Sequence, residues 1–391
     1  MITLNNAESV LDHLSERSIS IDSSHCVRVR NRHSSCRACQ EVCPAHAIAI
    51  ENNDFSLDID ICTECGACAN VCPTQALSSA AIPHIAWARF AHSLRGSNQA
   101  ERQVWICCKE HPLAHKDLDH LLVLPCLAHL DEVHYLLLAY YGTKTVLLHA
   151  PCDTCSNGSV RAVYEQTLKR TRILADSWNI RFDCDEIEEF QDQSSAYPID
   201  KDTGGRSRRG FFSSLGRSFK ELGLTIAADA IDVHTAKDKP SPTLAQKLTQ
   251  APGKLEVFFP ARMTALLNLL YESEQELDNA MLDREVQTRF WGKVSIDRSC
   301  QNCGMCARFC PTEALSNEDN NEEHAATPLL NRPRASEIVH EFRCSDCIQC
   351  HLCEDVCIAG ALHVSDKISH KELFDLEPAL IKPHHDDALT Q

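Results

Sequence analysis

In the middle of the chain, short apolar runs alternate with longer stretches of helical periodicity. The helical stretches cover residues 130–141 and 160–178. The apolar runs predict four β-strands, at residues 103–106, 121–124, 145–149 and 180–182. Strands that alternate with helices indicate a parallel sheet, because each crossover between parallel strands needs a long connection. We therefore expect an α/β domain with a parallel sheet over residues 101–190.

The composition changes after residue 190. Residues 191–255 are rich in Ser, Gly, Asp, Lys and Pro, which is typical of a linker. Within them, residues 206–222 place Arg and Lys beside Phe and Leu at helical spacing, which predicts a basic amphipathic helix. This helix either packs on the protein itself or makes a peripheral contact with an acidic partner or a membrane surface. A helical segment is expected at 256–290 and a tail at 367–391.

No stretch is long and apolar enough to predict a transmembrane span, which takes roughly 18 consecutive apolar residues. The first twenty residues contain no apolar core of a secretory signal. These features predict a cytoplasmic protein. Cysteine is unusually frequent, at 23 of the 391 residues. Because cytoplasmic thiols are kept reduced, so many cysteines are expected to bind metal rather than to form disulfides.

The net charge limits the choice of partner. Lys and Arg number 38 and Asp and Glu number 55, so the formal charge is −17. Nucleic acid is not expected to bind, because phosphate recognition needs a basic surface. An acidic surface instead favours association with basic patches on redox partner proteins.

One cysteine spacing recurs along the chain. The pattern Cys-x2-Cys-x2-Cys-x3-Cys occupies residues 62–72, 300–310 and 347–357, and a partial copy occupies residues 36–43. Three thiolates at three-residue intervals let one loop hold three corners of a cubane cluster. The fourth cysteine lies past the turn of that loop and is directed toward another cluster. Zinc also binds Cys-x2-Cys pairs, but zinc ribbons use two separated pairs rather than four cysteines in one run.

These motifs resemble those of bacterial two-cluster ferredoxins, in which the fourth cysteine of each motif binds the other cluster. The resemblance covers about a third of the chain. It implies α+β ferredoxin-like dicluster domains at residues 20–82 and 291–366, with about four [4Fe–4S] clusters in total. The two dicluster domains would flank the α/β middle domain.

The resemblance also implies the ligands of each cluster. In the N-terminal domain, one cluster would be held by Cys62, Cys65, Cys68 and Cys43. The other would be held by Cys36, Cys39, Cys72 and a further ligand. The family has a cysteine three positions before Cys36, where this chain has His33, so either Cys26 or His33 completes the site, or the cluster has three ligands. The all-thiolate site with Cys26 is favoured.

In the C-terminal domain, the resemblance implies one cluster held by Cys300, Cys303, Cys306 and Cys357, and another held by Cys347, Cys350, Cys353 and Cys310. Two departures from the family pattern occur here. Ile358 replaces the usual proline, and Cys344 is an additional thiol. Residues 316–324, which are acidic and rich in Asn, are expected to form a surface insertion.

Most remaining cysteines follow the predicted strands of the middle domain. They are Cys107, Cys108, Cys126, Cys152 and Cys155, with Cys184 near the fourth strand. The carboxyl ends of parallel strands meet at one edge of a sheet, where ligands of open α/β folds bind, so four or five thiols are expected to converge there. The spacing also resembles the small iron–sulfur subunit of methyl-viologen-reducing hydrogenase and heterodisulfide reductase systems, which implies a [2Fe–2S] cluster.

Three interpretations of these middle-domain thiols stay open. Cys108, Cys126, Cys152 and Cys155 bind a further metal or cluster, or Cys152 and Cys155 form a redox dithiol, or the thiols are buried and inert.

The sequence contains no G-x-G-x-x-G and no P-loop, so hydride transfer and nucleotide hydrolysis have no visible site. One-electron transfer is the expected chemistry. We expect a polyferredoxin that is a subunit or accessory of a larger oxidoreductase, rather than a stand-alone enzyme. The alternatives are a redox enzyme subunit whose middle domain carries a further cluster or a thiol/disulfide site, and a zinc-bound scaffold.

Overall fold

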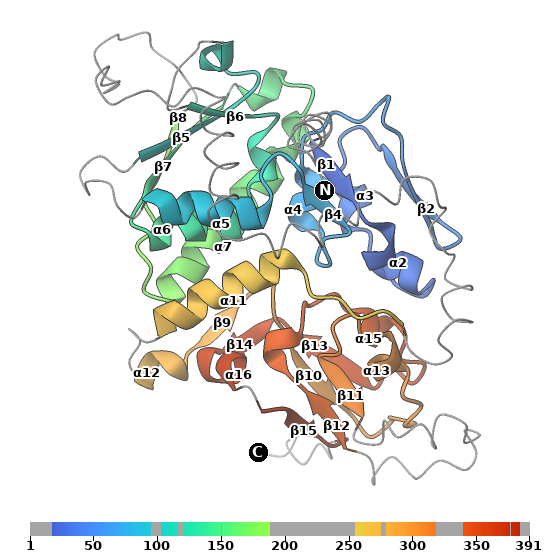
Figure 1. Cartoon of the computed structure of the whole chain (residues 1–391). Helices are drawn as coiled ribbons and strands as arrows, with labels where there is room; N and C mark the ends of the chain where they lie inside the picture. Colours follow the sequence, from blue (N-terminus) through green and yellow to red (C-terminus); the bar gives the residue numbers. More distant parts are fainter. Residues whose placement is uncertain are drawn as a thin grey trace, which may run out of the picture.

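The computed structural model describes residues 18–94, 103–115, 121–149, 151–187, 255–274, 279–317, 339–375 and 377–383. The N-terminal, middle and C-terminal parts surround helix α11 (Ala261–Glu274), which crosses between the middle part and the C-terminal part (Figure 1). The basic helix expected at 206–222, and the surrounding linker up to residue 254, lie outside the described residues.

The N-terminal part consists of two antiparallel strand pairs and short helices. Strand β1 (Ile19–Ile21) pairs with β4 (Leu77–Ser79), and β2 (Ile48–Glu51) pairs with β3 (Asp54–Leu57). Asn52 and Asn53 join β2 to β3 with φ angles of 51° and 62°, the left-handed backbone that tight hairpins need and asparagine tolerates. The helices are α2 (Val27–Arg30), α3 (Ala38–Glu41), α4 (Ala67–Val71) and α5 (His84–Ser93).

The middle part contains the expected parallel sheet, with strand order β6-β5-β7-β8. Its strands are β5 (Gln103–Cys108), β6 (Leu121–Leu124), β7 (Lys144–Leu148) and β8 (Cys184–Ile187). Its helices are α6 (Glu132–Tyr140) and α7 (Arg161–Ser177). The short 3-10 turn η5 (Leu127–His129) follows β6, and η6 (Cys152–Thr154) follows β7. All three strand pairs are parallel, which confirms that prediction.

The fourth strand begins later than the sequence pattern predicts, at Cys184 rather than at residue 180. Residues 178–180 instead terminate α7. The Ile180 N–H donates to the Ala175 carbonyl (2.8 Å), and Asn179 has a left-handed φ of 52°. The helix end therefore uses the backbone groups that an earlier strand would have needed.

The C-terminal part repeats the plan of the N-terminal part. Strand β10 (Lys293–Ile296) pairs with β13 (Leu362–Ser365), and β12 (His340–Phe342) lies between β11 (Leu315–Asn317) and β15 (Ala379–Ile381). The helices are α13 (Met305–Phe309), α15 (Leu352–Asp355) and α16 (His370–Phe374), and η10 (Cys344–Asp346) is a 3-10 turn. Helix α12 (Asn279–Leu282) follows α11 and precedes β9 (Glu285–Gln287).

Residues 367–381, expected as a tail, contain regular structure. Strand β14 (Lys367–Ser369) pairs with β9, and α16 and β15 follow it. Ile368 and Leu373 are completely buried, and Ser369 and Glu372 form a reciprocal capping box at the start of α16. This segment therefore belongs to the packed fold.

The middle and C-terminal parts share one hydrophobic core. Leu136 of α6, Leu270 of α11 and Trp291 before β10 all belong to it. In the described part of the chain, no helix has both the length and the apolar character needed to cross a membrane.

His370 lies at the junction between these two parts, where its ring is completely buried and lies 4.0 Å, centre to centre, from the ring of Trp178. Burial, together with the charge of Arg284, lowers the pKa of His370 to about 4. The imidazole is therefore neutral in the folded protein at neutral pH.

We expect His370 to make the protein sensitive to acid. An unfolded histidine has a pKa of about 6.5, so its contribution to stability is fully present above that pH and is lost as the pH falls toward 4. When the pH is lowered from about 7.5 to about 5, the unfolding free energy should fall in both proteins. The fall should be smaller in His370→Phe than in the wild type, by up to about 2 kcal/mol. Denaturant unfolding at both pH values measures this. His363→Phe, at a side chain 62% exposed, is the control and should behave as the wild type.

Candidate metal centres

The three complete cysteine motifs fold into the same loop. The residue directly before the second cysteine is left-handed in each, with φ of 54° at Glu64, 56° at Asn302 and 47° at Gln349. The residue after the second cysteine is also left-handed, and is Gly66, Gly304 or His351. A short helix (α4, α13 or α15) then begins and carries the third cysteine. This backbone turns the first three thiols of each motif toward a common point.

The first set of thiols comprises Cys43, Cys62, Cys65 and Cys68. Burial raises the pKa of Cys68, and the negative charges of Cys65, Cys62 and Cys43 and of Cys39 of the second set contribute to the rise. The Ala47 N–H donates to Cys43 Sγ (3.3 Å). The set is the one that the ferredoxin resemblance implies.

The second set comprises Cys26, Cys36, Cys39 and Cys72, which line one hollow of about 370 Å³. Burial raises the pKa of Cys39 to about 12, and the charges of the other three cysteines add to the shift. His33 is exposed and does not line the hollow. Of the two alternatives for the fourth ligand, the structure thus places the Cys26 thiol, rather than the His33 imidazole, beside the other three.

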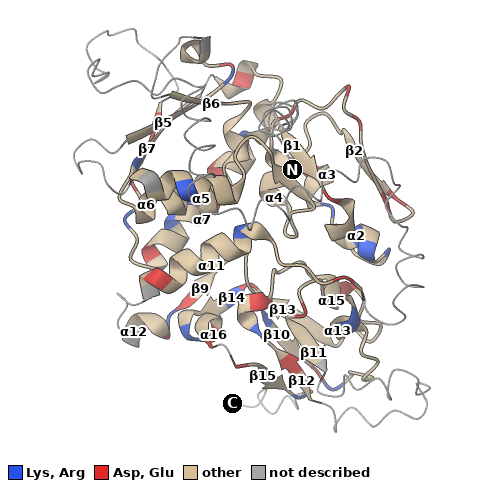
Figure 2. Cartoon of the chain, viewed as in Figure 1, with Lys and Arg blue, Asp and Glu red and all other residues tan. Residues whose placement is uncertain are grey.

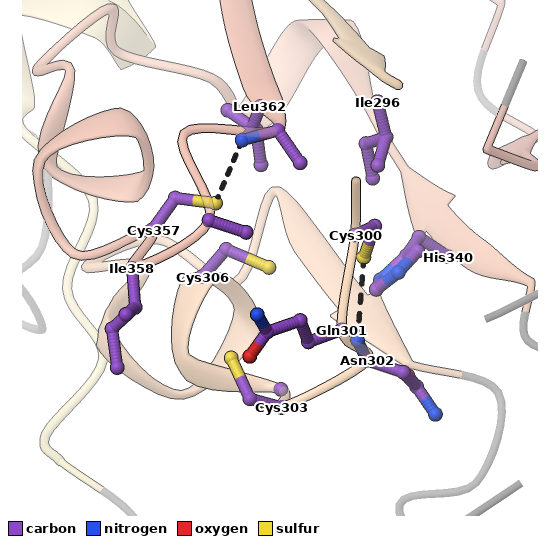
Figure 3. Close-up of a pocket in the computed structure, with 13 residues that line it drawn as sticks. Ile296, Cys300, Gln301, Asn302, Cys303, Cys306, His340, Cys357, Ile358 and Leu362 are labelled. Atoms are coloured by element: carbon purple, nitrogen blue, oxygen red, sulfur yellow. Dashed lines mark hydrogen bonds between the residues drawn. The ribbon is translucent and has the colours of Figure 1, made fainter. Parts of the chain in front are cut away.

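The third set comprises Cys300, Cys303, Cys306 and Cys357, which line a hollow of about 420 Å³. Figure 3 shows their four sulfur atoms around this hollow, with His340 and Ile296 beside Cys300. Backbone N–H groups donate to two of the sulfurs, from Asn302 to Cys300 (3.4 Å) and from Ala361 to Cys357 (3.2 Å). Ile358, in the place of the usual proline, is 83% exposed.

The fourth set comprises Cys310, Cys347, Cys350 and Cys353. Burial raises the pKa of Cys347 to about 11, and the charge of Cys310 adds to this. The Gln349 N–H donates to Cys347 Sγ (3.5 Å). Cys344, the additional thiol, lies outside this set, and its S–H donates to the Gly292 carbonyl (3.7 Å).

The donor atoms of all four sets fit an iron–sulfur cluster. Each set offers four sulfurs, and backbone N–H groups point at sulfurs in three of the sets. Burial raises the pKa of Cys26, Cys65, Cys306 and Cys350, one thiol in each set, so crowded thiolates at these places need a positively charged inorganic core to stabilise them. The second and fourth sets are further alike in that Thr74 and Thr312 hydroxyls lie 3.6 and 3.7 Å from Cys72 and Cys310.

Comparison with known protein families matches both ends of the chain. Residues 34–77 match a 4Fe-4S dicluster domain, and residues 299–361 match a second 4Fe-4S dicluster domain. No curated protein and no solved structure matches the chain. The chain thus carries ferredoxin-type dicluster domains near both ends, which indicate about four [4Fe–4S] clusters and a function in electron transfer. The resemblance of residues 101–190 to hydrogenase and reductase subunits receives no support from these comparisons.

The middle-domain thiols converge only in part. Burial, together with the charges of Cys65, Cys108 and Cys152, raises the pKa of Cys126 to about 12, so these thiols share one neighbourhood at the carboxyl edge of the sheet. Cys155 follows on the same loop as Cys152, and its Sγ accepts a hydrogen bond from the Asn157 N–H (3.4 Å).

Two other cysteines lie apart from this group of thiols. Cys107 alternates with Cys108 along β5 and packs with a different apolar cluster. Cys184 begins β8 and lies opposite Thr145 near the start of β7, at the amino edge of the sheet. The expectation that Cys184 joins the others assumed a strand ending before it, whereas the strand begins there.

Two residues from outside the N-terminal domain support the first two sets, and the sequence did not predict either of them. His129 Nε2 donates to the Glu64 carbonyl (2.9 Å), inside the first cysteine loop, and its ring fills the space beside Gly66. Arg262 is 1% exposed and donates to the carbonyls of Asn70 (3.0 Å) and Cys72, at the end of α4. A buried arginine far along the chain has no local sequence signal.

A buried polar cluster of His84, Asp131 and His134 has the residue types of a cation site. Its atoms already have partners: His84 Nε2 and His134 Nδ1 each lie 2.7 Å from the Asp131 carboxylate, and the Arg262 guanidinium lies 3.5 Å away. Asp131 also caps α6. A cation there would meet the positive charge of Arg262, so the cluster is a structural network that joins α5, α6 and α11.

We expect Gly66→Ala to damage the first set. Gly66 has φ of 80°, and an added Cβ would lie 2.4 Å from His129 Cγ, so the variant should lose roughly 2–4 kcal/mol of stability from backbone strain and overpacking together. Gly142→Ala is the matched control, because Gly142 has φ of 70° but nothing within 4 Å of the added Cβ, and it should lose only about 1 kcal/mol. Iron content and thermal unfolding of both variants measure the difference, and equal losses would contradict the role of the His129 contact.

Proposed function

We propose that this chain is a polyferredoxin, an electron carrier that passes single electrons between two partner proteins as a subunit or accessory of a larger oxidoreductase. The observation that carries the proposal is the folding of the chain into four separate sets of four cysteine thiols. A carrier needs such sites and needs no substrate pocket.

The proposed ligands are the four sets themselves. The N-terminal domain would use Cys43, Cys62, Cys65 and Cys68 for one cluster and Cys26, Cys36, Cys39 and Cys72 for the other. The C-terminal domain would use Cys300, Cys303, Cys306 and Cys357 for one and Cys310, Cys347, Cys350 and Cys353 for the other. When bound, each cluster supplies a one-electron oxidation–reduction step. The protein holds the thiolates at fixed positions, donates N–H groups to the sulfurs and limits the access of water.

Two arginines near the second set hold the end of α4, and each pairs with a carboxylate, Arg262 with Asp131 (3.5 Å) and Arg289 with Glu132. Arg262 and Arg289 both lie close enough to Cys72 for the charges to interact, and both donate to the Asn70 carbonyl (3.0 and 2.8 Å). Because the two carboxylates offset this positive charge, the arginines are proposed to act on the second set by fixing the backbone at Cys72. The electron donor and acceptor are proposed to be redox proteins, and the thiol chemistry suits a reducing compartment such as the cytoplasm.

Iron and sulfide analysis of anaerobically purified protein tests this function. We expect about sixteen irons per chain with matching acid-labile sulfide, and visible absorbance that bleaches on reduction. Cys65→Ala should remove about four irons, because it takes away a ligand of the first set. Cys344→Ala is the control, since this thiol is buried but outside every set, and its iron content should be unchanged. A colourless protein that holds zinc and no sulfide would contradict the proposal.

A second candidate function is favoured by the position of Cys126. This thiol and Cys65 pack against the same small apolar cluster, and Cys126 interacts electrostatically with Cys108 and Cys152. The middle domain would then be a redox enzyme subunit with a further cluster or a thiol/disulfide site, supplied with electrons through the first set.

The pair Cys152→Ser and Cys155→Ser separates the two functions. If the middle domain holds a [2Fe–2S] cluster, the double variant should lose about two irons and their spectrum. If it holds only a dithiol, the iron content should not change, but mild oxidation should remove two more titratable thiols from the wild type than from the double variant. If the middle domain has no redox role, both the iron content and the loss of thiols on oxidation should be the same in the two proteins. Cys184→Ser, at the opposite edge of the sheet, is the control for both measurements.

A further inference from the structure

The two dicluster domains meet at a small interface that contains thiols from both. Val27 of α2 packs with Leu352 and Val356 of the C-terminal domain in one apolar cluster. Cys36 and Cys350 both pack against this cluster. A cysteine of the second set and a cysteine of the fourth set therefore lie on either side of the same few side chains.

Arg30 fixes this interface. The residue is 5% exposed, and its guanidinium donates to three carbonyls of the later chain, at Glu256 (2.6 Å), Phe309 (3.0 Å) and Cys310 (3.4 Å). The Ser35 N–H also donates to the Asp355 carboxylate (2.8 Å). Figure 2 shows basic positions on α2, the helix that carries Arg30. A buried guanidinium bound to a carbonyl of one proposed ligand residue holds the two domains in one register.

Within each domain, short pieces of chain connect the two sets. Helix α4 carries Cys68 of the first set, and Cys72 of the second set is its C-cap. In the same way, α13 carries Cys306 of the third set and ends at Cys310 of the fourth. Each domain thus holds its own pair of sets side by side.

We infer that the four sets form one unbranched series, in the order first, second, fourth and third, and that electrons cross between the domains at the interface held by Arg30. The inference rests on the proposed function. In each step one electron leaves a reduced cluster and reduces its neighbour, with no bond to the protein broken and no proton required. An external one-electron donor supplies the electron at one end, and an acceptor removes it at the other.

The ends of the series differ. At the first set, Cys65 packs beside Cys126 of the middle domain. At the third set, Ile358 follows the ligand Cys357 and is largely exposed. Because electron tunnelling weakens steeply with distance, the series would carry electrons between the surface at the third set and the middle domain, through the Arg30 interface.

Two protein variants test the order through magnetic coupling, which is strong only between neighbouring reduced clusters. Cys65→Ala with Cys303→Ala leaves the second and fourth sets, the proposed inner pair. Cys39→Ala with Cys350→Ala leaves the first and third sets, the proposed outer pair. Each full-length protein should hold about eight irons. After dithionite reduction, low-temperature EPR should show broadened, spin-coupled signals for the inner pair and two isolated signals for the outer pair.

Arg30→Leu in the inner-pair protein should keep the iron but lose the spin coupling, because the domains separate or rotate. Arg28→Leu is the control on the same helix, and the coupling should persist, since Arg28 bonds within its own domain to Gln40 (2.9 Å). The same two substitutions in the chain with all its cysteines provide a second comparison if the ligand variants fold poorly. If the inner-pair protein holds its full iron but its spectra show no coupling, the inferred series is wrong and the proposed function stands. If both pair proteins lack iron, the proposed function is wrong as well.

Discussion

The rest of this structure depends on one constraint: four cysteine thiols must be held close together, largely out of water, in each of the four sets. Burial and mutual repulsion raise the pKa values of these groups, so the thiolate form needs an inorganic core with positive charge at each set. The surrounding chain is organised to hold sulfurs at such positions. Left-handed residues turn the loops, backbone N–H groups face the sulfurs, and very short helices carry cysteines from one set to the next.

The dicluster domains are too small to be independent of what surrounds them. The loop of the first set is held by His129 of the middle domain, and the end of α4 is held by Arg262 and Arg289 from the chain that leads into the C-terminal domain. The middle domain in turn shares its core with the C-terminal domain. The arginines that bind the α4 carbonyls also pair with Asp131 and Glu132 of the middle domain, so they tie the second set to that domain.

The contact between the two dicluster domains also explains why the four sets can form one series. Two domains that met through a wide polar surface would keep their metal sites far apart. Here the contact is made by Val27 and Arg30 of α2, by the Ser35–Asp355 hydrogen bond and by residues of the cysteine loops, so the proposed inner clusters lie at the contact. The middle domain occupies one end of the series and shows the only partial convergence of thiols in the described residues outside the four sets.

Much of the site could be predicted from the sequence because cysteine spacing is a local property. Three thiols at three-residue intervals determine a loop, and the recurrence of that loop identifies the dicluster domains at both ends. Alternating apolar runs and helical stretches likewise determined the parallel sheet. The tertiary structure decided the remaining features: Cys26 rather than His33 beside the second set, the start of β8 at Cys184, the packing of residues 367–381, and the placement of Arg30 and Arg262 between domains. The start of β8 follows from the local ending of α7. The other features need contacts between segments separated by tens to hundreds of residues, and no spacing along the chain encodes which segments will meet.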